Sequence, residues 1–338
     1  MTSYYCVLDG APLRIDVQPL DEASIADAIA KVKARPTRYS WLKLMASSPW
    51  DYLRAASQEA DVDETLSSKL GAGPGRDRET ALRFGTAVHQ LVLGAPDRVV
   101  VYDRAAADAA LPATPAKKRR SKEGKHRGVD ALLDPAPAGA TKGVTRRGAA
   151  WEAFSAEHTA LAHTILSAAE YAEARAMADM LLRSRRACEW LFDGTIVEQR
   201  IDWTLRGRAI RSTPDARRPG AWVADLKSCA DSSPDRFRPQ IYRLLYHAQL
   251  ETYLRASEAQ DGSRPGSARI VAIDRKRPPR CYEITEEGLE LGARCLGAWI
   301  ETLLTCEASG HFPFDGLHVA PPPEYMTDVE LLDVPKEG

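Results

Sequence analysis

The segment RSTPDARRPGAWVADLKS, residues 211–228, constrains the fold of this chain more than any other stretch. Asp215 follows a proline, and Asp225 and Lys227 stand inside an apolar run that is typical of a buried strand. Burying a charge is costly unless the charge is paired or coordinates a metal. The segment therefore predicts either a structural ion pair or a functional site within a sheet.

Alternation along a strand indicates which of these side chains share a space. Residues i and i+2 point to the same face, so Asp225 and Lys227 project together while Leu226 packs on the opposite face. Asp215 comes alongside them if residues 217–220 form a hairpin turn. Two carboxylates repel each other unless a cation lies between them, and hard oxygen ligands suit Mg²⁺ or Mn²⁺. The alternative is a buried Asp–Lys pair that only fixes the strand register.

The spacing of apolar residues divides the chain into a mainly helical first part and a β-rich second part. The second part runs as three strands, a helix, two strands and a helix. This order predicts an α/β (α+β) fold, with a mixed central sheet flanked by helices and an N-terminal helical layer. Helices are expected at residues 19–34, 39–57 (two short ones), 77–94, 149–158, 167–192 (one or two), 235–257 and 286–309, and strands at 98–103, 194–205, 209–216, 221–228, 267–276 and 280–285.

A long basic loop is expected at about residues 105–148, which are rich in Ala, Pro, Gly, Lys and Arg and show no periodicity. The net charge of the whole chain is only −1, so a globally basic nucleic-acid binder is not indicated. Clustered Lys and Arg displace counterions from a polyanion, so the loop predicts a DNA-binding segment or, alternatively, a merely solvated one. Its basic residues are Lys117, Lys118, Arg119, Arg120, Lys122, Lys125 and Arg127.

Several classes of protein are not indicated by the sequence. No apolar run approaches the ~20 residues that span a bilayer, and no signal peptide is expected. Neither a GxxxxGK[ST] loop nor a GxSxG turn is present. The six cysteines are scattered without a CxxC pair, which predicts reduced thiols in a cytoplasm.

The pattern Pro-Asp, nine residues, then Asp-x-Lys resembles the signature of the PD-(D/E)xK nuclease superfamily. The surrounding sequence is similar to that of the exodeoxyribonuclease VIII type among the RecB-like nucleases of phage recombination systems. Four segments carry this resemblance, which covers roughly residues 39–315. They are FGTAVHQLVL (84–93), VEQRIDWT (197–204), TPDARRPGAWVADLKSCADSSPDRF (213–237) and YHAQLETY (246–253).

The resemblance implies a role for each matched residue. Asp215 and Asp225 would bind Mg²⁺, with Mn²⁺ as a substitute, and the Leu226 carbonyl and His89 would be further metal ligands. Lys227 would orient the attacking water or stabilise negative charge on a phosphate oxygen. The remaining catalytic candidates are Glu198, Gln249 and Tyr253.

Ordinary structural roles are the alternatives for these residues. His89 could be a satisfied core or surface histidine, and Glu198 could be a surface partner of Arg200. Gln249 and Tyr253 lie four residues apart and share a helix face, where Tyr253 could simply fill the core.

The resemblance implies a metal-dependent exonuclease that digests the ends of linear double-stranded DNA from 5′ to 3′ in recombination. It also implies a single-strand annealing partner protein, a homo-oligomeric ring and a bacterial or phage-encoded setting. From the apolar runs and the cysteines we expect no membrane association and a cytoplasmic location. The alternatives are an endonuclease or single-strand-specific nuclease of the same fold, or a catalytically silent DNA-binding or assembly module. The expected organisation is an N-terminal segment at 1–38, a nuclease domain at 39–318 and an irregular acidic, proline-rich tail at 319–338.

Overall fold

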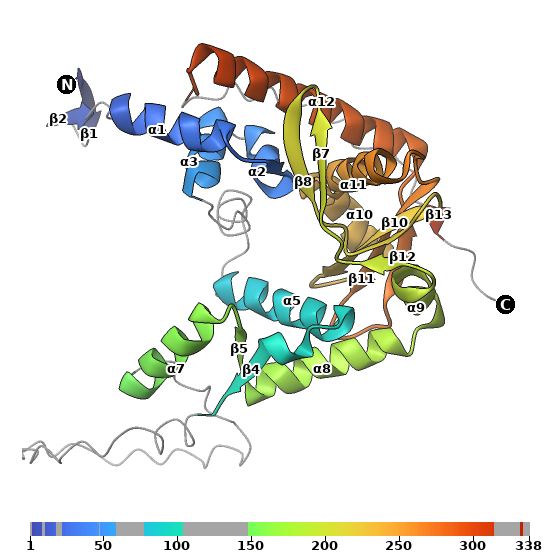
Figure 1. Cartoon of the computed structure of the whole chain (residues 1–338). Coiled ribbons are helices and arrows are strands. Elements are labelled where there is room, and N and C mark those ends of the chain that lie inside the picture. Colours follow the sequence, from blue (N-terminus) through green and yellow to red (C-terminus); the bar gives the residue numbers. More distant parts are fainter. Residues whose placement is uncertain are drawn as a thin grey trace, which may run out of the picture.

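The computed structural model describes residues 2–8, 11–17, 22–46, 48–58, 78–103, 148–313 and 332–333 (Figure 1). Its helices are α1 (Glu22–Lys33), α2 (Tyr39–Leu42), α3 (Pro49–Gln58), α5 (Arg78–Leu93), α7 (Ala149–Ala160), α8 (Ala168–Leu182), α9 (Arg185–Phe192), α10 (Pro234–Arg243), α11 (Tyr246–Asp261) and α12 (Glu286–Ser309), with the 3-10 turns η1 (Lys43–Ala46) and η2 (Pro96–Arg98). Its strands are β1 (Thr2–Leu8), β2 (Ala11–Val17), β3 (Thr37–Arg38), β4 (Val99–Tyr102), β5 (Thr164–Ser167), β6 (Ile196–Val197), β7 (Ile201–Leu205), β8 (Arg208–Ser212), β9 (Ala216–Arg218), β10 (Trp222–Ser228), β11 (Ser267–Ile273), β12 (Arg280–Glu283) and β13 (Leu332–Asp333).

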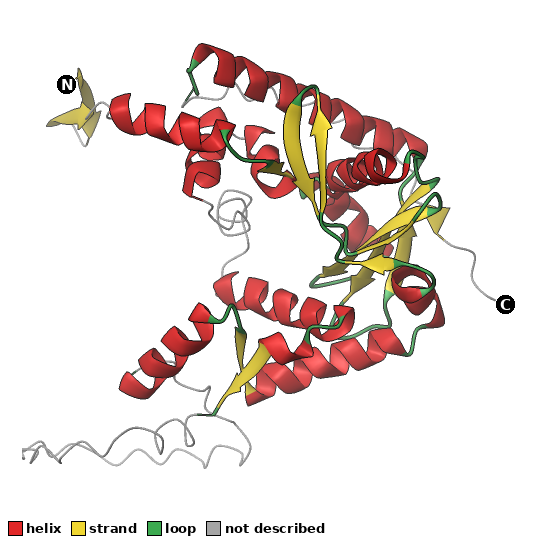
Figure 2. Ribbon diagram, viewed as in Figure 1, coloured by secondary structure: helices red, strands yellow, loops and turns green. Residues whose placement is uncertain are grey.

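The central sheet is mixed, in the order β13-β12-β11-β10-β9-β6. β10 runs parallel to β11 and antiparallel to β9, so a hairpin and a crossover meet at the same strand. Parallel neighbours need a long connection, and here α10 and α11 supply it. The expected mixed sheet with flanking helices is confirmed (Figure 2).

Two hydrophobic clusters cover the two faces of the central sheet. On one face, Ala224 and Leu226 of β10 pack with side chains of α5, α8 and α9. On the other face, Val223 packs with Phe237 of α10 and Leu250 of α11. The alternation of β10 therefore places its apolar side chains in both cores, which explains why the middle of the strand, residues 223–226, is buried.

A second, three-stranded sheet in the order β3-β8-β7 packs with the N-terminal helices and with α12. The buried Arg208 fastens this layer, because its guanidinium donates to the carbonyl oxygens of Val32 and Arg35 at 2.6 and 2.7 Å and lies 3.0 Å from Glu307 of α12. In the described ranges, no helix is long and apolar enough to cross a membrane.

Two expected elements are each divided in the structure. The strand expected at 194–205 splits into β6 and β7, which belong to different sheets, and the chain bends between them at Glu198 with a left-handed φ of 48°. The helix expected at 235–257 splits into α10 and α11 at Leu245, whose φ is 62°. The hydroxyl of Tyr39 donates to the Leu245 carbonyl at 2.6 Å, so this corner is held by a residue far away in the chain.

The expected hairpin turn lies slightly later than the sequence indicates. β9 continues to Arg218 because Arg217 and Arg218 pair with Val223 and Trp222 of β10, and the turn occupies residues 219–221 instead of 217–220. β5 and the β1–β2 hairpin have no counterpart among the expected elements.

Asp274, directly after β11, is fully buried and serves as a turn anchor. Its carboxylate accepts hydrogen bonds from the Ser232 N–H and hydroxyl and from the N–H groups of Lys276 and Arg277, all between 2.7 and 2.8 Å. Burial alone would raise the pKa of this carboxyl, but these hydrogen bonds lower it to about 2.

The depressed pKa of Asp274 predicts a pH-dependent loss in Asp274→Asn. The ionised carboxylate stabilises the fold at pH values above its unfolded pKa of about 4, and this stabilisation is lost as the pH falls toward about 2. We therefore expect Asp274→Asn to lower the free energy of unfolding in urea by about 2 kcal/mol at pH 7, and the gap to the unsubstituted protein to narrow below pH 4. Asp179→Asn, at a half-exposed helix pair with Arg175, is the control and should change stability by less than about 0.5 kcal/mol. A gap that stays constant down to pH 3 would contradict the assignment.

Candidate active site

The hairpin of β9 and β10 brings the two predicted acids together. Ala216 pairs with Ala224, so Asp215 lies beside the strand position of Asp225, and the two residues are 8% and 2% exposed. Asp215 Oδ2 accepts the backbone N–H of Leu226 at 2.7 Å. The backbone between the two acids thus fixes the orientation of the first carboxylate.

Lys227 lies against Asp225, with Nζ 2.7 Å from Oδ2. The same ammonium lies 4.7 Å from the centre of the Tyr246 ring, which is a cation–π distance. Both contacts restrict the lysine, which is only 19% exposed. The sequence prediction that Asp225 and Lys227 project to one face agrees with this geometry.

His89 of α5 bridges two acids from the other side. Its Nε2 lies 2.9 Å from Asp215 Oδ2, and its Nδ1 lies 3.3 Å from Glu198 Oε1. Glu198 also donates its N–H to the Asp215 carbonyl at 3.0 Å. Its left-handed backbone, unusual for a residue with a side chain, therefore places this acid at the corner where the two sheets diverge.

Gly85 permits the approach of α5 to β10. A Cβ at this position would lie 2.7 Å from the Ser228 hydroxyl oxygen, at the end of the strand that carries Lys227. The glycine lies one helical turn before His89 on α5, so the close packing delivers the imidazole to the hairpin.

Gln249 and Tyr253 of α11 form a pair, with Gln249 Nε2 donating to the Tyr253 hydroxyl at 2.8 Å. Burial raises the pKa of Tyr253, and the charges of Asp225 and Asp215 raise it further, so the phenol lies within the field of the two acids.

Two further tyrosines belong to this environment although sequence reasoning did not select them. Tyr246 precedes Gln249 by three residues on the same helix face, which was an available signal, whereas Tyr39 comes from α2 and only the fold reveals it.

The two acids have pKa values that are shifted in opposite directions. Burial raises the pKa of both. For Asp225, burial and the negative charge of Asp215 together outweigh the Lys227 ammonium and give a value of about 6. For Asp215 the burial effect is outweighed by His89, Lys227 and the Leu226 N–H, and its pKa is lowered. Burial disfavours protonated His89, but Asp215 and Glu198 outweigh it and raise the pKa of the imidazole. Paired acids with diverging pKa values are typical of catalytic sites.

The donor atoms suit a hard divalent cation. Two buried carboxylates, a neighbouring carbonyl and a histidine are present, and Asp225 Oδ2 accepts no well-aligned hydrogen bond within the described residues although it contacts Lys227. As they are arranged here, the His89 imidazole and the Lys227 ammonium compensate the two carboxylates. No three His, Cys, Asp or Glu side chains of the described segments are grouped as a metal centre. Metal ligation by this set would therefore require His89 to exchange its contact with Asp215 for the ion.

A family comparison adds the decisive observation. Residues 142–317 match the profile of the PDDEXK-like domain of unknown function (DUF3799). The chain belongs to this family. The matched region of the DUF3799 domain contains Glu198, the β9–β10 hairpin with its two acids, and the Gln249–Tyr253 pair of α11. His89 and Tyr39 lie ahead of it.

Comparison with solved structures places the DUF3799 protein in the same fold class. A crystal structure from Eubacterium rectale, provisionally named an exonuclease, matches with a TM-score of 0.50 and 13% identity over 95% of this chain and 97% of that one. The crystal structure of SSO0001 matches at 19% identity over 45% of this chain and 69% of that one, but its TM-score of 0.25 is too low to indicate a shared fold. No curated protein sequence matches the chain. The fold is thus that of the PD-(D/E)xK nuclease superfamily.

The seven basic residues predicted to bind DNA, from Lys117 to Arg127, lie outside the described residues.

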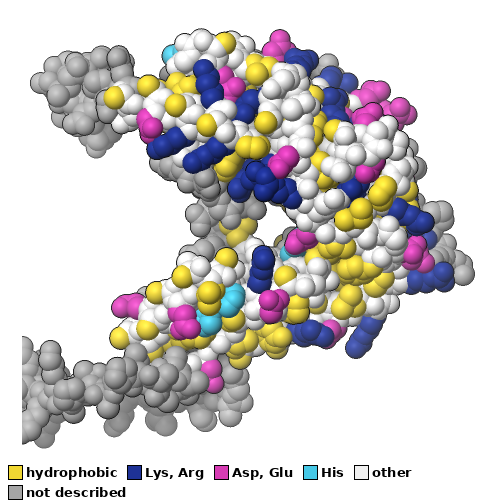
Figure 3. Space-filling view, viewed as in Figure 1, with side chains coloured by type: hydrophobic (Ala, Val, Ile, Leu, Met, Phe, Trp, Pro, Cys, Tyr) yellow, Lys and Arg dark blue, Asp and Glu magenta, His cyan; other side chains and the backbone are white. Residues whose placement is uncertain are grey.

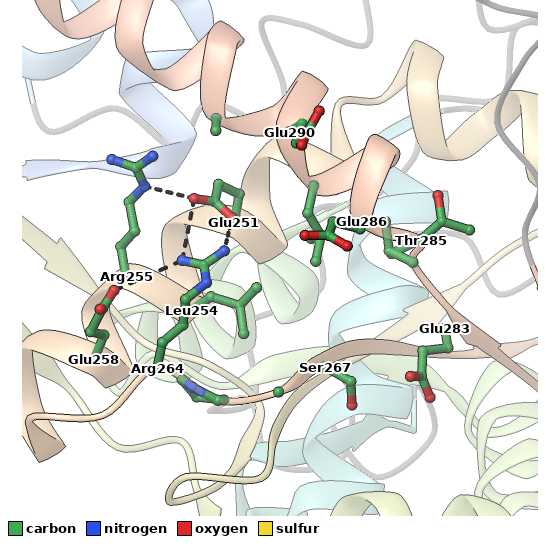
Figure 4. A pocket seen from close by; sticks show the side chains of 15 residues that line it. Glu251, Leu254, Arg255, Glu258, Arg264, Ser267, Glu283, Thr285, Glu286 and Glu290 are labelled. Atoms are coloured by element: carbon green, nitrogen blue, oxygen red, sulfur yellow. Dashed lines mark hydrogen bonds and ion pairs between the residues drawn. The ribbon is translucent and has the colours of Figure 1, made fainter.

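A separate pocket of about 690 Å³ lies between the second half of α11, the start of α12 and the strands β11 and β12 (Figure 4). There Glu251 is held by Arg255 and Arg264 at 2.7 and 2.6 Å. None of the predicted site residues that the structure describes lines this pocket.

Proposed function

We propose that this DUF3799 protein is a metal-dependent deoxyribonuclease that digests the ends of linear double-stranded DNA from 5′ to 3′ in a bacterial or phage recombination system. The observation that supports it most is the meeting of Asp215, Asp225 and Lys227 in one buried space on the central hairpin, with His89 bound to the first acid. A hairpin that only needed a fixed register would not need two acids, an ammonium and an imidazole in its interior.

In this proposal Asp215, Asp225, the Leu226 carbonyl and His89 hold Mg²⁺, for which Mn²⁺ can substitute. When bound, such an ion supplies a water of lowered pKa and polarises the phosphate. In the hydrolysis the water oxygen forms a bond to phosphorus, and the bond from phosphorus to the leaving sugar oxygen breaks.

The other side chains of the site position the reacting groups and stabilise the charge that develops on the phosphate. The Lys227 ammonium, already held by Asp225 and the Tyr246 ring, donates to the phosphate oxygen on which negative charge develops or orients the water. Glu198 keeps His89 oriented through its contact with Nδ1. The Gln249–Tyr253 pair lies on the helix that faces the acids and fixes the position of the phenol.

Further parts of the proposal rest on the resemblance to recombination exonucleases. They are DNA contacts by the basic residues from Lys117 to Arg127, a single-strand annealing partner and a homo-oligomeric ring. The rival functions are an endonuclease or single-strand-specific nuclease of the same fold, and a silent DNA-binding module.

Incubation of the purified protein with end-labelled linear duplex, closed circular duplex and single strands tests the proposal. Progressive loss of the 5′ label from linear duplex, with intact circles, is expected. Cleavage of closed circles would favour the endonuclease, cleavage of single strands alone would favour the single-strand-specific enzyme, and binding without cleavage in Mg²⁺ would favour the silent module.

Cleavage is expected to need Mg²⁺ or Mn²⁺ and to cease in EDTA. Ca²⁺ should support DNA binding but little cleavage, because its looser coordination positions water less well. Titration of each metal into chelated protein, followed by the rate of label release, measures this dependence. Undiminished cleavage in excess chelator would exclude the mechanism.

A further inference from the structure

A row of arginines lies on the outward face of the three-stranded sheet, beside the candidate active site. Arg38 of β3 is the strand partner of Arg211 of β8, and Arg211 is in turn the partner of Asp202 of β7. Arg200 stands directly before β7 and contacts Asp202 at 2.6 Å. We call Arg38, Arg200 and Arg211, together with Asp202, the arginine row.

Asp202 orients two of the guanidinium groups. It accepts from Arg200 Nε and Nη2 at 3.0 and 2.6 Å and from Arg211 Nε at 3.0 Å. The side chains are partly exposed, at 56% for Arg200, 48% for Asp202 and 27% for Arg211. The single acid aligns the two guanidiniums but leaves three positive charges against one negative charge.

Within the part of the chain that the structure describes, the remaining guanidinium donors have no hydrogen-bond acceptor. Among the described residues, Nη1 and Nη2 of Arg211 donate no hydrogen bond, and Arg38 makes only a stacking contact, with Cζ 4.7 Å from the centre of the Trp41 ring. Like charges on neighbouring strands disfavour each other. Arg38 and Arg211 are such neighbours, so an anion placed between them would relieve the repulsion and use the remaining donors.

The position of the arginine row relates it to the candidate active site. Arg211 lies four residues before Asp215, and Arg200 lies two residues after Glu198. An extended chain covers at most about 3.6 Å per residue, so the Cα atoms of Arg211 and Asp215 are no more than about 14 Å apart. At about 3.4 Å per base pair this is within about four steps of a duplex. Figure 3 shows Lys and Arg side chains gathered beside the hollow at the centre of the view.

We propose that the arginine row binds non-scissile phosphates of the DNA backbone next to the site of cleavage. This inference rests on the proposed nuclease function and adds to it the surface that holds the substrate strand. The planar guanidinium fork matches the phosphate oxygens, and contacts of this kind position a duplex without reading its sequence.

Binding of a short labelled duplex, measured in EDTA at several salt concentrations, tests the arginine row while no cleavage occurs. Arg38→Ala with Arg211→Ala should weaken binding roughly 10- to 50-fold near physiological salt and reduce the slope of log affinity against log salt by about two, for two lost phosphate contacts. The loss should be the same for unrelated sequences. Arg38→Lys with Arg211→Lys should restore most of the slope, because the charges are kept.

Arg175→Ala with Arg185→Ala is the matched control, because both arginines are exposed members of helix ion pairs on α8 and α9. It should leave the affinity and the slope unchanged. An unchanged slope in the Arg38 and Arg211 variant, with normal binding by the unsubstituted protein, would overturn the inference and leave the nuclease proposal standing. If the unsubstituted protein cleaves no DNA in Mg²⁺ but the arginine effect on binding is present, the nuclease proposal fails and the binding surface remains.

Discussion

Asp225→Asn is expected to lower the rate of DNA cleavage by about 10³-fold or more while the protein stays folded. The substitution keeps the shape of the side chain, removes its charge and replaces one carboxylate oxygen with an amide NH2 group. Burial already disfavours the ionised form of Asp225, as its raised pKa shows. Loss of the charge therefore removes the free-energy cost of burying it in the folded state. The variant does leave Lys227 without its ion-pair partner, and this opposes the gain.

Cleavage of end-labelled duplex and thermal unfolding should be measured on the same preparations. Asp215→Asn and Lys227→Ala are expected to give losses of similar size, because all three groups converge on one space. Asp193→Asn serves as the control, because this acid is 67% exposed in an ion pair with Arg218 at the far end of β9. If a folded Asp225→Asn protein cleaved DNA at a rate close to normal, Asp225 would have no part in the reaction.

Gly292→Ala is expected to destabilise the protein by about 3 kcal/mol, an unusually large effect for one methyl group. The new Cβ would lie 2.6 Å from the His247 carbonyl oxygen and 3.1 Å from Ala248 Cα. Both atoms belong to the backbone of α11, so no side-chain rotation can relieve the clash. Since α11 also carries Tyr246 and the Gln249–Tyr253 pair, the same displacement should reduce activity.

Gly297→Ala, one and a half turns later on α12, is the opposing control. Apart from the adjoining backbone of α12, no atom of the described residues lies within 4 Å of a Cβ at this position, so alanine gains helix propensity without a clash. An increase in stability of about 0.5–1 kcal/mol is expected. Urea unfolding of both variants measures the difference, and stability changes of the same sign would show that α11 and α12 are not packed this closely.

The strand that carries Asp225 and Lys227 was predictable because its signal is local. An apolar run with alternating charged positions specifies both the strand and the face of each side chain, and the register with Asp215 followed within two residues.

The corners of the fold were not predictable in the same way. Residues 194–205 alternate without interruption, and no glycine marks the bend at Glu198. Leu245 likewise interrupts what reads as one helix, and its carbonyl is held by Tyr39, 206 residues earlier. In both cases the cause is a tertiary contact, which periodicity within a short window does not contain.

In the β9–β10 hairpin, the relative position of Asp215 and Asp225 is set by strand pairing and does not depend on the number of residues between them. Asp215 and Asp225 face each other because Ala216 pairs with Ala224, whereas the turn at 219–221 lies at the other end of the strands. A longer turn, or strands extended by matched pairs of residues, would leave the carboxylates opposed, while a single residue inserted within one strand would exchange its inward and outward side chains. Distant relatives can therefore carry gaps other than nine residues between Pro-Asp and Asp-x-Lys, and a sequence search with a fixed gap would overlook them.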